Sequence, residues 1–127
     1  LLINVTEFLR DAAAYAALKK KVFPRILKNS GGQSPIRVWV PGCSTGEEVY
    51  SLAIALFEFL TRDTPRKPIQ IFGTDISDAV LAKARAGVYP ESIAQSVSSD
   101  RLRRSFHKIE GGYQISKFIR DCVVFAR

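Results

Sequence analysis

The segment IRVWVPGCSTGEEVYSLAIAL, residues 36–56, joins a short glycine-containing loop to two consecutive carboxylates. Its β-forming residues end at Pro41-Gly42, and a helical pattern begins at Glu47-Glu48. A loop between a strand and a helix commonly holds phosphate groups, because the backbone amides at a helix start attract anions. Here carboxylates stand at the helix start instead of a lysine, so the loop suits a positively charged ligand better than a phosphate.

Two phosphate-binding motifs are excluded by the spacing of this loop. A Walker A loop needs G-x-x-x-x-G-K-[ST], whereas Gly42 and Gly46 are one residue too close together and Glu47 occupies the lysine position. A dinucleotide loop needs the three glycines of G-x-G-x-x-G. The loop has only two glycines, and the two glutamates in the first helical turn would repel the pyrophosphate of a dinucleotide. Two like charges about 4 Å apart repel by roughly 4 kcal/mol at an effective dielectric constant of about 20. A nicotinamide-dependent dehydrogenase is therefore disfavoured.

A third carboxylate follows the next predicted strand, IQIFGTD at residues 69–75, which ends at Asp75. Parallel strands bring their carboxyl ends to one edge of a sheet, and an acidic residue there commonly binds ribose hydroxyls. A ligand with an ammonium group, a sulfonium and an adenosine would suit this edge, and S-adenosylmethionine has all three. The predicted cofactor site contains Gly42, Cys43, Gly46, Glu47, Glu48 and Asp75.

Each of these carboxylates also has a purely structural interpretation. Glutamates in the first turn of a helix complement its dipole by about 0.3–1 kcal/mol. Asp75 can equally cap the helix that Ser77 begins. Cys43 is interpreted as a small loop residue and not as a nucleophile, and Tyr89 as a packing residue.

Strands alternate with helices around this edge, which is typical of an α/β fold with a parallel sheet. Helices are predicted at 5–22, where Pro24 breaks the pattern, at 47–61 and at 78–86. PRIL, residues 24–27, is predicted to form a further helical turn with Pro24 as its first residue. Strands are predicted at 36–40, 69–75 and 122–126. A capped helix is predicted in SSDRLRRSF and a hairpin in FHKIEGGYQIS, around Gly111-Gly112. The inward residues predicted for the helix 47–61 are Val49, Leu52, Ala53, Leu56 and Leu60.

Composition narrows the class of protein. The 127 residues are 46% hydrophobic with a net charge of +7, and no recognisable nucleic-acid-binding module accompanies the charge. Two cysteines and one histidine make a metal site improbable and favour a reducing, cytoplasmic compartment. No apolar run is long enough for a transmembrane segment. Because the chain contains no methionine, we expect it to be a piece of a longer protein.

Four segments together resemble the bacterial chemotaxis receptor glutamate methyltransferases: NVTEFLRD, VWVPGCSTGEEVYSLAI, GTDISDAVLAKARAGVYPES and LRRSFHKIEGGYQISKFIRDCVVFA. The resemblance covers nearly the whole chain. It implies a partial Rossmann-like class I methyltransferase sheet with flanking helices and the start of a small β-subdomain. SVSSDRLRRSF and GGYQISKFIRD are similar to members fused to a receptor methylesterase.

The resemblance implies methyl transfer from S-adenosylmethionine to glutamate side chains in the cytoplasmic region of chemoreceptors, leaving S-adenosylhomocysteine. It implies that Asn4, Thr6 and Arg10 belong to the cofactor or active site, with Arg10 as the catalytic positioning residue. Glu47, in preference to Glu48, would hold the methionine ammonium group. A glutamate is already ionised at neutral pH and is its own nucleophile, so no acid–base constellation is expected.

The family also implies a division of residues 1–127, as a single partial methyltransferase domain, into four parts. These are a helical lead-in at 1–30, a cofactor-binding βαβ core at 36–90, a helix and β-hairpin insertion at 91–121, and a third core strand at 122–127. Further family segments on both sides are absent, so activity is expected of the parent protein and the exposed sheet edge is expected to self-associate. The alternative function is a non-catalytic module that binds S-adenosylmethionine or docks a receptor.

Overall fold

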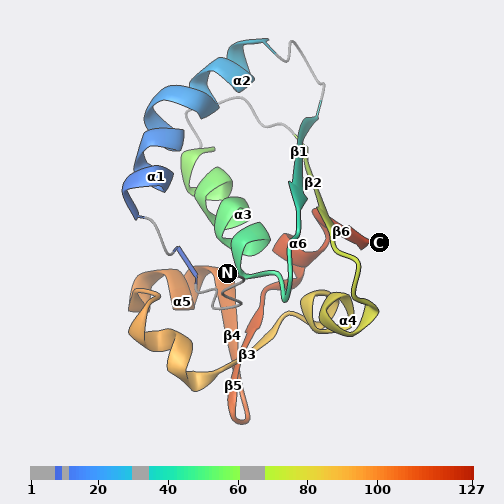
Figure 1. Ribbon diagram of the computed structural model, residues 1–127. Coiled ribbons are helices and arrows are strands. Elements are labelled where there is room, and N and C mark those ends of the chain that lie inside the picture. Colours follow the sequence, from blue (N-terminus) through green and yellow to red (C-terminus); the bar gives the residue numbers. More distant parts are fainter. Residues whose placement is uncertain (1–7, 10–11, 30–34, 61–67) are drawn as a thin grey trace.

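A three-stranded parallel sheet forms the centre of the computed structural model (Figure 1). Its strands are β1 (Ile36–Pro41), β2 (Ile69–Thr74) and β6 (Val123–Ala126), in the order β1-β2-β6. The three predicted core strands are confirmed, and with them the α/β fold class. The structure describes residues 8–9, 12–29, 35–60 and 68–127.

The two faces of this sheet differ. Residues such as Ile71 and Phe125 are buried against the helix that follows β1. On the opposite face Trp39, Phe72 and Val124 form one row, since Phe72 is the register partner of both others. All three are exposed, Trp39 to 66%. Parallel sheets usually carry helices on both faces, whereas the described residues leave this row uncovered.

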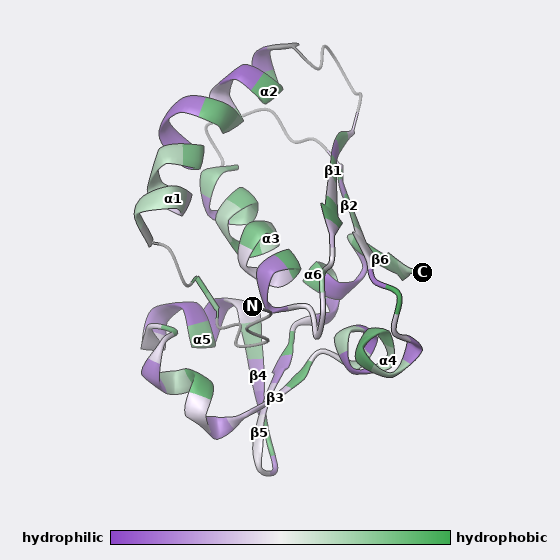
Figure 2. Ribbon diagram, in the orientation of Figure 1, coloured by the Kyte–Doolittle hydropathy of each residue, from purple (hydrophilic) through white to green (hydrophobic). Residues whose placement is uncertain are grey.

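Helix α3 (Glu47–Phe59) follows β1 and is more deeply buried than its sequence pattern predicts. Val49, Ala53 and Leu56 face inward as expected, while Leu52 and Leu60 are only half-buried. The helix is enclosed by the sheet and by the N-terminal helical segment, so it buries residues around much of its circumference. The buried residues that the pattern did not single out are Tyr50, Ser51, Ile54 and Ala55. Figure 2 shows hydrophobic residues along much of α3 and hydrophilic ones along α5 (Ser99–Ser105).

The N-terminal helical segment is not interrupted before Pro24 as predicted, but the further helical turn predicted over residues 24–27 is confirmed. Helix α1 (Ala12–Ala17) continues through a π-turn, η1 (Leu18–Val22), into α2 (Phe23–Asn29). Proline is tolerated in the first turn of a helix, where its missing N–H is not needed. The N–H of Phe23 reaches back to the carbonyl of Leu18, and this wider turn accommodates the proline ring. The predicted start of this helix, before residue 8, lies outside the described residues.

The connection after β2 has the predicted form. Helix α4 (Asp78–Ala86) is capped by Ser77, whose hydroxyl accepts a hydrogen bond from the Val80 amide at 3.4 Å. It ends at Gly87, which has the left-handed backbone (φ 65°) expected of a helix stop. None of the helices that the structure describes is both long and apolar enough to cross a membrane.

A second, antiparallel sheet lies beside the N-terminal end of α3 (Figure 1). The predicted hairpin is confirmed as β4 (Phe106–Ile109) and β5 (Gly112–Ile115). A third strand, β3 (Val88–Pro90), pairs with β5 and was not predicted, because its three residues carry no periodic pattern. The helical turns of this region are η2 (Glu91–Gln95), the predicted capped helix α5 (Ser99–Ser105), and α6 (Lys117–Arg120).

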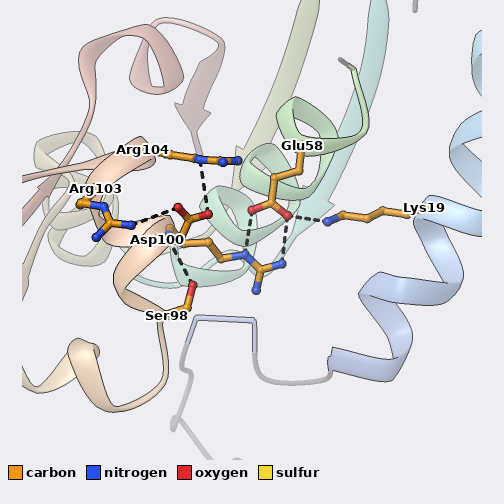
Figure 3. A network of polar contacts seen from close by, with 7 residues as sticks. Lys19, Glu58, Ser98, Asp100, Arg103 and Arg104 are labelled. Carbon is orange, nitrogen blue, oxygen red and sulfur yellow. Dashed lines mark hydrogen bonds and ion pairs between the residues drawn. The ribbon is translucent and has the colours of Figure 1, made fainter. Parts of the chain in front are cut away.

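One carboxylate joins three of these elements. Glu58, near the end of α3, accepts two hydrogen bonds from the guanidinium of Arg101 in α5, at 2.7 and 2.9 Å, and pairs with Lys19 in η1 (Figure 3). Burial raises the pKa of Glu58, but its bonds to Arg101 and then Lys19 outweigh this and lower the pKa to about 2. Asp100 pairs with Arg103 and Arg104 at the exposed surface beside this network.

The start of α3 depends on Gly46. Its backbone is left-handed (φ 95°), and a β-carbon there would lie 3.1 Å from both the Ala84 β-carbon and the Tyr89 hydroxyl. Gly42 is also left-handed (φ 62°), but a β-carbon there would meet nothing within 4 Å. Glycine is therefore needed at position 46 for both its left-handed backbone and the lack of space for a side chain, whereas at position 42 only the backbone conformation favours glycine.

We predict that Glu58→Gln destabilises the protein at pH 7 by roughly 1–2 kcal/mol, because the charged pairs with Arg101 and Lys19 are lost. The folded-state pKa of Glu58 lies below its ordinary value of 4.5. Its stabilising effect is therefore complete above about pH 4.5 and is lost as the pH falls towards 2. Thermal unfolding of both proteins between pH 7 and 3 measures this loss of stability.

Asp100→Asn, in an exposed pair, is the control and should change stability by less than about 1 kcal/mol. A difference between wild type and Glu58→Gln that grows in acid would contradict the assignment.

We predict that Gly46→Ala destabilises the protein by about 2–4 kcal/mol, because the new methyl group adds crowding to an unfavourable backbone conformation. Gly42→Ala is the matched substitution and should cost only about 1–2 kcal/mol, the conformational part alone. Urea denaturation of both variants gives the two values. Equal losses would mean that Ala84 and Tyr89 move aside without cost.

Candidate functional site

The loop between β1 and α3 is a tight turn with left-handed backbone at three of its five residues, Gly42, Ser44 and Gly46. Ser44 has φ 51°, an uncommon value for a residue with a side chain. Three of its amides are used inside the protein. The Cys43 amide donates to the Thr74 carbonyl at 2.9 Å, and the Gly46 amide donates to the Cys43 carbonyl at 3.1 Å. The Ser44 amide donates to the side-chain carboxylate of Asp75. These three amides are thus already occupied, unlike those of a loop that cradles a phosphate.

Asp75 holds this loop from the end of β2. One carboxylate oxygen accepts the Ser44 amide at 3.0 Å, and the other accepts the Ser77 amide at 3.0 Å. Hydrogen bonds from Ser77 and then Ser44 lower the pKa of Asp75 below its ordinary value, so the group is ionised at neutral pH. A carboxylate offers about four acceptor positions, and these two bonds leave room for further donors. Asp75 therefore has a structural role, but Ser77 and not Asp75 caps α4. This role does not exclude ligand binding.

The two glutamates at the start of α3 differ in their surroundings. Glu47 is half-buried, accepts a hydrogen bond from the Thr45 hydroxyl, and faces a cavity. Glu48 is exposed and does not line that cavity. The structure thus distinguishes two residues that the sequence places in the same turn.

The cavity beside Glu47 has a volume of about 470 Å³. It lies between the start of α3, the Phe8–Leu9 turn and the segment from β3 to η2. Within the described part of the chain, Glu47 provides the only charged side chain of its wall. The other lining residues are apolar or neutral: Phe8, Tyr89, Pro90, Ser92, Ile93, Gln95 and Ser96. A wall with one carboxylate and no cation favours a positively charged guest.

Tyr89 supports the loop from its second side. Its buried hydroxyl donates to the carbonyl of Thr45 at 2.7 Å. Burial, and then the nearby charge of Glu47, raise the pKa of Tyr89, so the hydroxyl remains a neutral donor. Sequence reasoning treated Tyr89 only as packing. A tyrosine two residues after a helix-ending glycine carries no signal that it contacts a loop 44 residues away.

Two other expectations concern cysteine chemistry and metals. Cys43 is buried, and burial followed by the charge of Asp75 raises the pKa of its thiol, so it is poorly suited to act as a nucleophile. The interpretation of Cys43 as a small loop residue is thus supported.

No cluster of potential metal ligands is present in the part of the chain that the structure describes. Asn4, Thr6 and Arg10 lie outside the described residues.

Comparison with known proteins shows the family to which the chain belongs. The family model described as "CheR methyltransferase, SAM binding domain" matches residues 4–127, where SAM is S-adenosylmethionine. Chemotaxis protein methyltransferase 1 of Pseudomonas aeruginosa is 36% identical over 126 residues, covering 96% of this chain and 46% of that protein. The chemotaxis protein methyltransferase of Borreliella burgdorferi is 38% identical over 127 residues, covering 98% and 45%.

A third relative is longer. It is the "Uncharacterized 104.1 kDa protein in hypE 3'region" of Rhodobacter capsulatus, 38% identical over 127 residues that cover 100% of this chain and 13% of that protein. The chain thus spans less than half the length of these curated relatives. The family match covers nearly all of it, and we conclude that the chain belongs to the CheR methyltransferase SAM-binding domain family.

Proposed function

We propose that the cavity beside Glu47 and the loop at the carboxyl end of β1 together bind S-adenosylmethionine. Glu47 would contact the cationic methionine end, and Asp75, which follows β2 and does not line the cavity, would contact the ribose. The observation that carries this proposal is the position of Glu47, the only charged side chain in the described wall of a cavity of about 470 Å³. The ammonium and sulfonium groups of the cofactor match a single carboxylate in neutral surroundings. A pyrophosphate would meet a negative charge instead.

The remaining predicted residues take narrower roles in this proposal. Glu48 is exposed, and we assign it to the helix dipole and not to the ligand. Cys43 and Gly46 contribute through the shape of the loop, since the thiol is buried and the space beside Gly46 is filled by Ala84 and Tyr89. Gly42 has open space around it and is the glycine at which a ligand can approach the backbone.

We further propose that the whole protein transfers methyl groups to glutamate side chains of chemoreceptors. When bound, the cofactor supplies an electrophilic methyl group; a substrate carboxylate forms the new O–CH₃ bond as the C–S bond breaks and its electrons return to sulfur. The chain then has only to hold both partners in line. Support comes from the family and from relatives named chemotaxis protein methyltransferases.

Several finer assignments belong to the same proposal. Asn4, Thr6 and Arg10 would complete the site, with Arg10 positioning substrate or cofactor. The division into a lead-in at 1–30, a βαβ core at 36–90, an insertion at 91–121 and a final strand at 122–127 belongs to the proposal. The separate antiparallel sheet supports an insertion before β6, and β3 (Val88–Pro90), which pairs with β5, joins that sheet to the end of the proposed core. A cytoplasmic location follows from the proposed substrate, the cytoplasmic region of the receptors.

We predict that Glu47→Gln and Asp75→Asn each weaken S-adenosylmethionine binding at least tenfold, because each removes a charge or an acceptor that the ligand needs. Isothermal titration of the cofactor and of S-adenosylhomocysteine measures this. Both ligands carry the ammonium group that Glu47 would contact, so its loss should weaken the binding of both. The cofactor should be weakened more, because its sulfonium adds a positive charge that the thioether of the product lacks.

Glu48→Gln is the matched control, since it removes the same charge one residue along the helix. It should leave the affinity within about twofold. If Glu48→Gln lowers the affinity as much as Glu47→Gln does, the affinity depends only on the net charge at the start of the helix and not on a contact with Glu47. If neither variant changes the affinity, the cavity beside Glu47 is not the site.

Transfer of a labelled methyl group from S-adenosylmethionine to purified chemoreceptor cytoplasmic domains separates catalysis from mere binding. We expect base-labile label on receptor glutamates, since methyl esters hydrolyse in alkali. A protein that binds the cofactor tightly yet leaves the receptors unlabelled is instead the non-catalytic binding or docking module.

Self-association through a sheet edge also remains a prediction. In the described residues β1 and β6 each have a neighbour on one side only, and the exposed row of Trp39, Phe72 and Val124 crosses the sheet between them. Unpaired strand edges favour pairing between chains. Light scattering should therefore show dimers or larger species at micromolar concentration, whereas a monodisperse monomer with a cooperative melting transition would contradict this.

A further inference from the structure

A short turn far from the loop in sequence is held against the loop. Phe8 and Leu9 are both buried, with 1% and 8% of their surface exposed. Leu9 has a left-handed backbone (φ 54°), which is rare for a bulky side chain and persists only when surrounding contacts hold it. Two sets of contacts, one made by Ser51 and one by Phe8, hold this turn.

Ser51 makes the first of these contacts. Its hydroxyl accepts the Leu9 amide at 2.8 Å and donates to the Glu47 carbonyl at 2.7 Å. The second bond, to the carbonyl four residues earlier, is common for a serine within a helix. The first bond is not local, because it spans 42 residues and joins the turn to α3. Ser51 is fully buried, so water does not compete for either bond.

Phe8 makes the second set of contacts. Its ring packs edge-on against Tyr89, with centroids 4.7 Å apart, and against Phe106 at 5.3 Å. Tyr89 in turn donates to Thr45. The turn is thus connected to both the loop and the helix that follows it. Ser51 joins the turn to the Glu47 carbonyl at the start of α3, and Tyr89 joins it to the Thr45 carbonyl in the loop.

We propose that Ser51 is a positioning residue for the cofactor: it holds the Phe8–Leu9 turn so that Phe8 forms the cavity wall beside Glu47. Both Phe8 and Glu47 line the same cavity, and Ser51 bonds to the backbone of Glu47 and of the residue after Phe8. This inference rests on the proposed function, since the ligand it serves is S-adenosylmethionine. Ser51 itself does not line the cavity.

The test compares Ser51→Ala with Tyr50→Phe, the neighbouring position on the same helix. Tyr50 is also buried and donates one hydrogen bond, to the Ala84 carbonyl at 2.7 Å, away from the Phe8–Leu9 turn. Both variants lose buried hydrogen bonds and some thermal stability. Only Ser51→Ala should release the turn.

Two readouts are taken on the protein and both variants. Amide hydrogen exchange of Leu9, followed by NMR without ligand, should accelerate at least tenfold in Ser51→Ala and remain near the wild-type rate in Tyr50→Phe. Titration with S-adenosylmethionine should show about tenfold weaker binding for Ser51→Ala only. In a Glu47→Gln background the same serine substitution should cost much less, because the cavity wall that Ser51 positions then lies beside no carboxylate for the cation.

The outcomes separate this inference from the proposed function. Unchanged Leu9 exchange in Ser51→Ala would overturn the contact itself. Faster exchange with unchanged affinity, or equal loss of affinity in Tyr50→Phe, would overturn the positioning role while the proposed function stands. A wild-type protein that does not bind S-adenosylmethionine would overturn the proposed function and with it this role, whatever Leu9 does.

Discussion

The arrangement of the site depends on the hydrogen bond from the Ser44 amide to the Asp75 carboxylate, at 3.0 Å. It joins the loop after β1 to the end of β2 and stabilises a left-handed serine that would otherwise be unfavourable. Tyr89 holds the same loop from the other side through Thr45. The loop thus has a fixed shape before any ligand arrives, so little ordering cost remains to be met on binding.

This shape determines which ligand chemistry is available. A phosphate-binding loop presents backbone amides, but here those of Cys43, Ser44 and Gly46 are occupied within the protein. Among the residues that the structure describes, what faces the cavity is the carboxylate of Glu47 with neutral side chains around it. Carboxylates attract cations, which explains why a loop of this shape carries glutamates where others carry a lysine.

Local patterns predicted the three core strands, the cap and stop of α4, the capped helix α5, the helical turn at Pro24 and the hairpin, because each is determined by neighbouring residues. The burial of α3 was not predicted, because it depends on contacts distant in sequence. Helix α3 is buried around much of its circumference because other elements enclose it, and no periodicity reveals that. The π-turn that joins the first helix to the turn at Pro24 is local, but no residue pattern indicates it. At the site, sequence reasoning identified the carboxylates by type and position, but not Tyr89 or Ser51, whose partners lie 44 and 42 residues away.

The central claim is that a preformed loop holds S-adenosylmethionine between Glu47 and Asp75. A crystal structure of the protein with S-adenosylhomocysteine tests it most directly, because this product keeps the ammonium group and the ribose without reacting. The account predicts the ammonium group within hydrogen-bonding distance of Glu47, the ribose hydroxyls on Asp75, and the bond from Ser44 to Asp75 intact. A ligand bound elsewhere, or a loop that must rearrange and break that bond to admit it, would contradict the account.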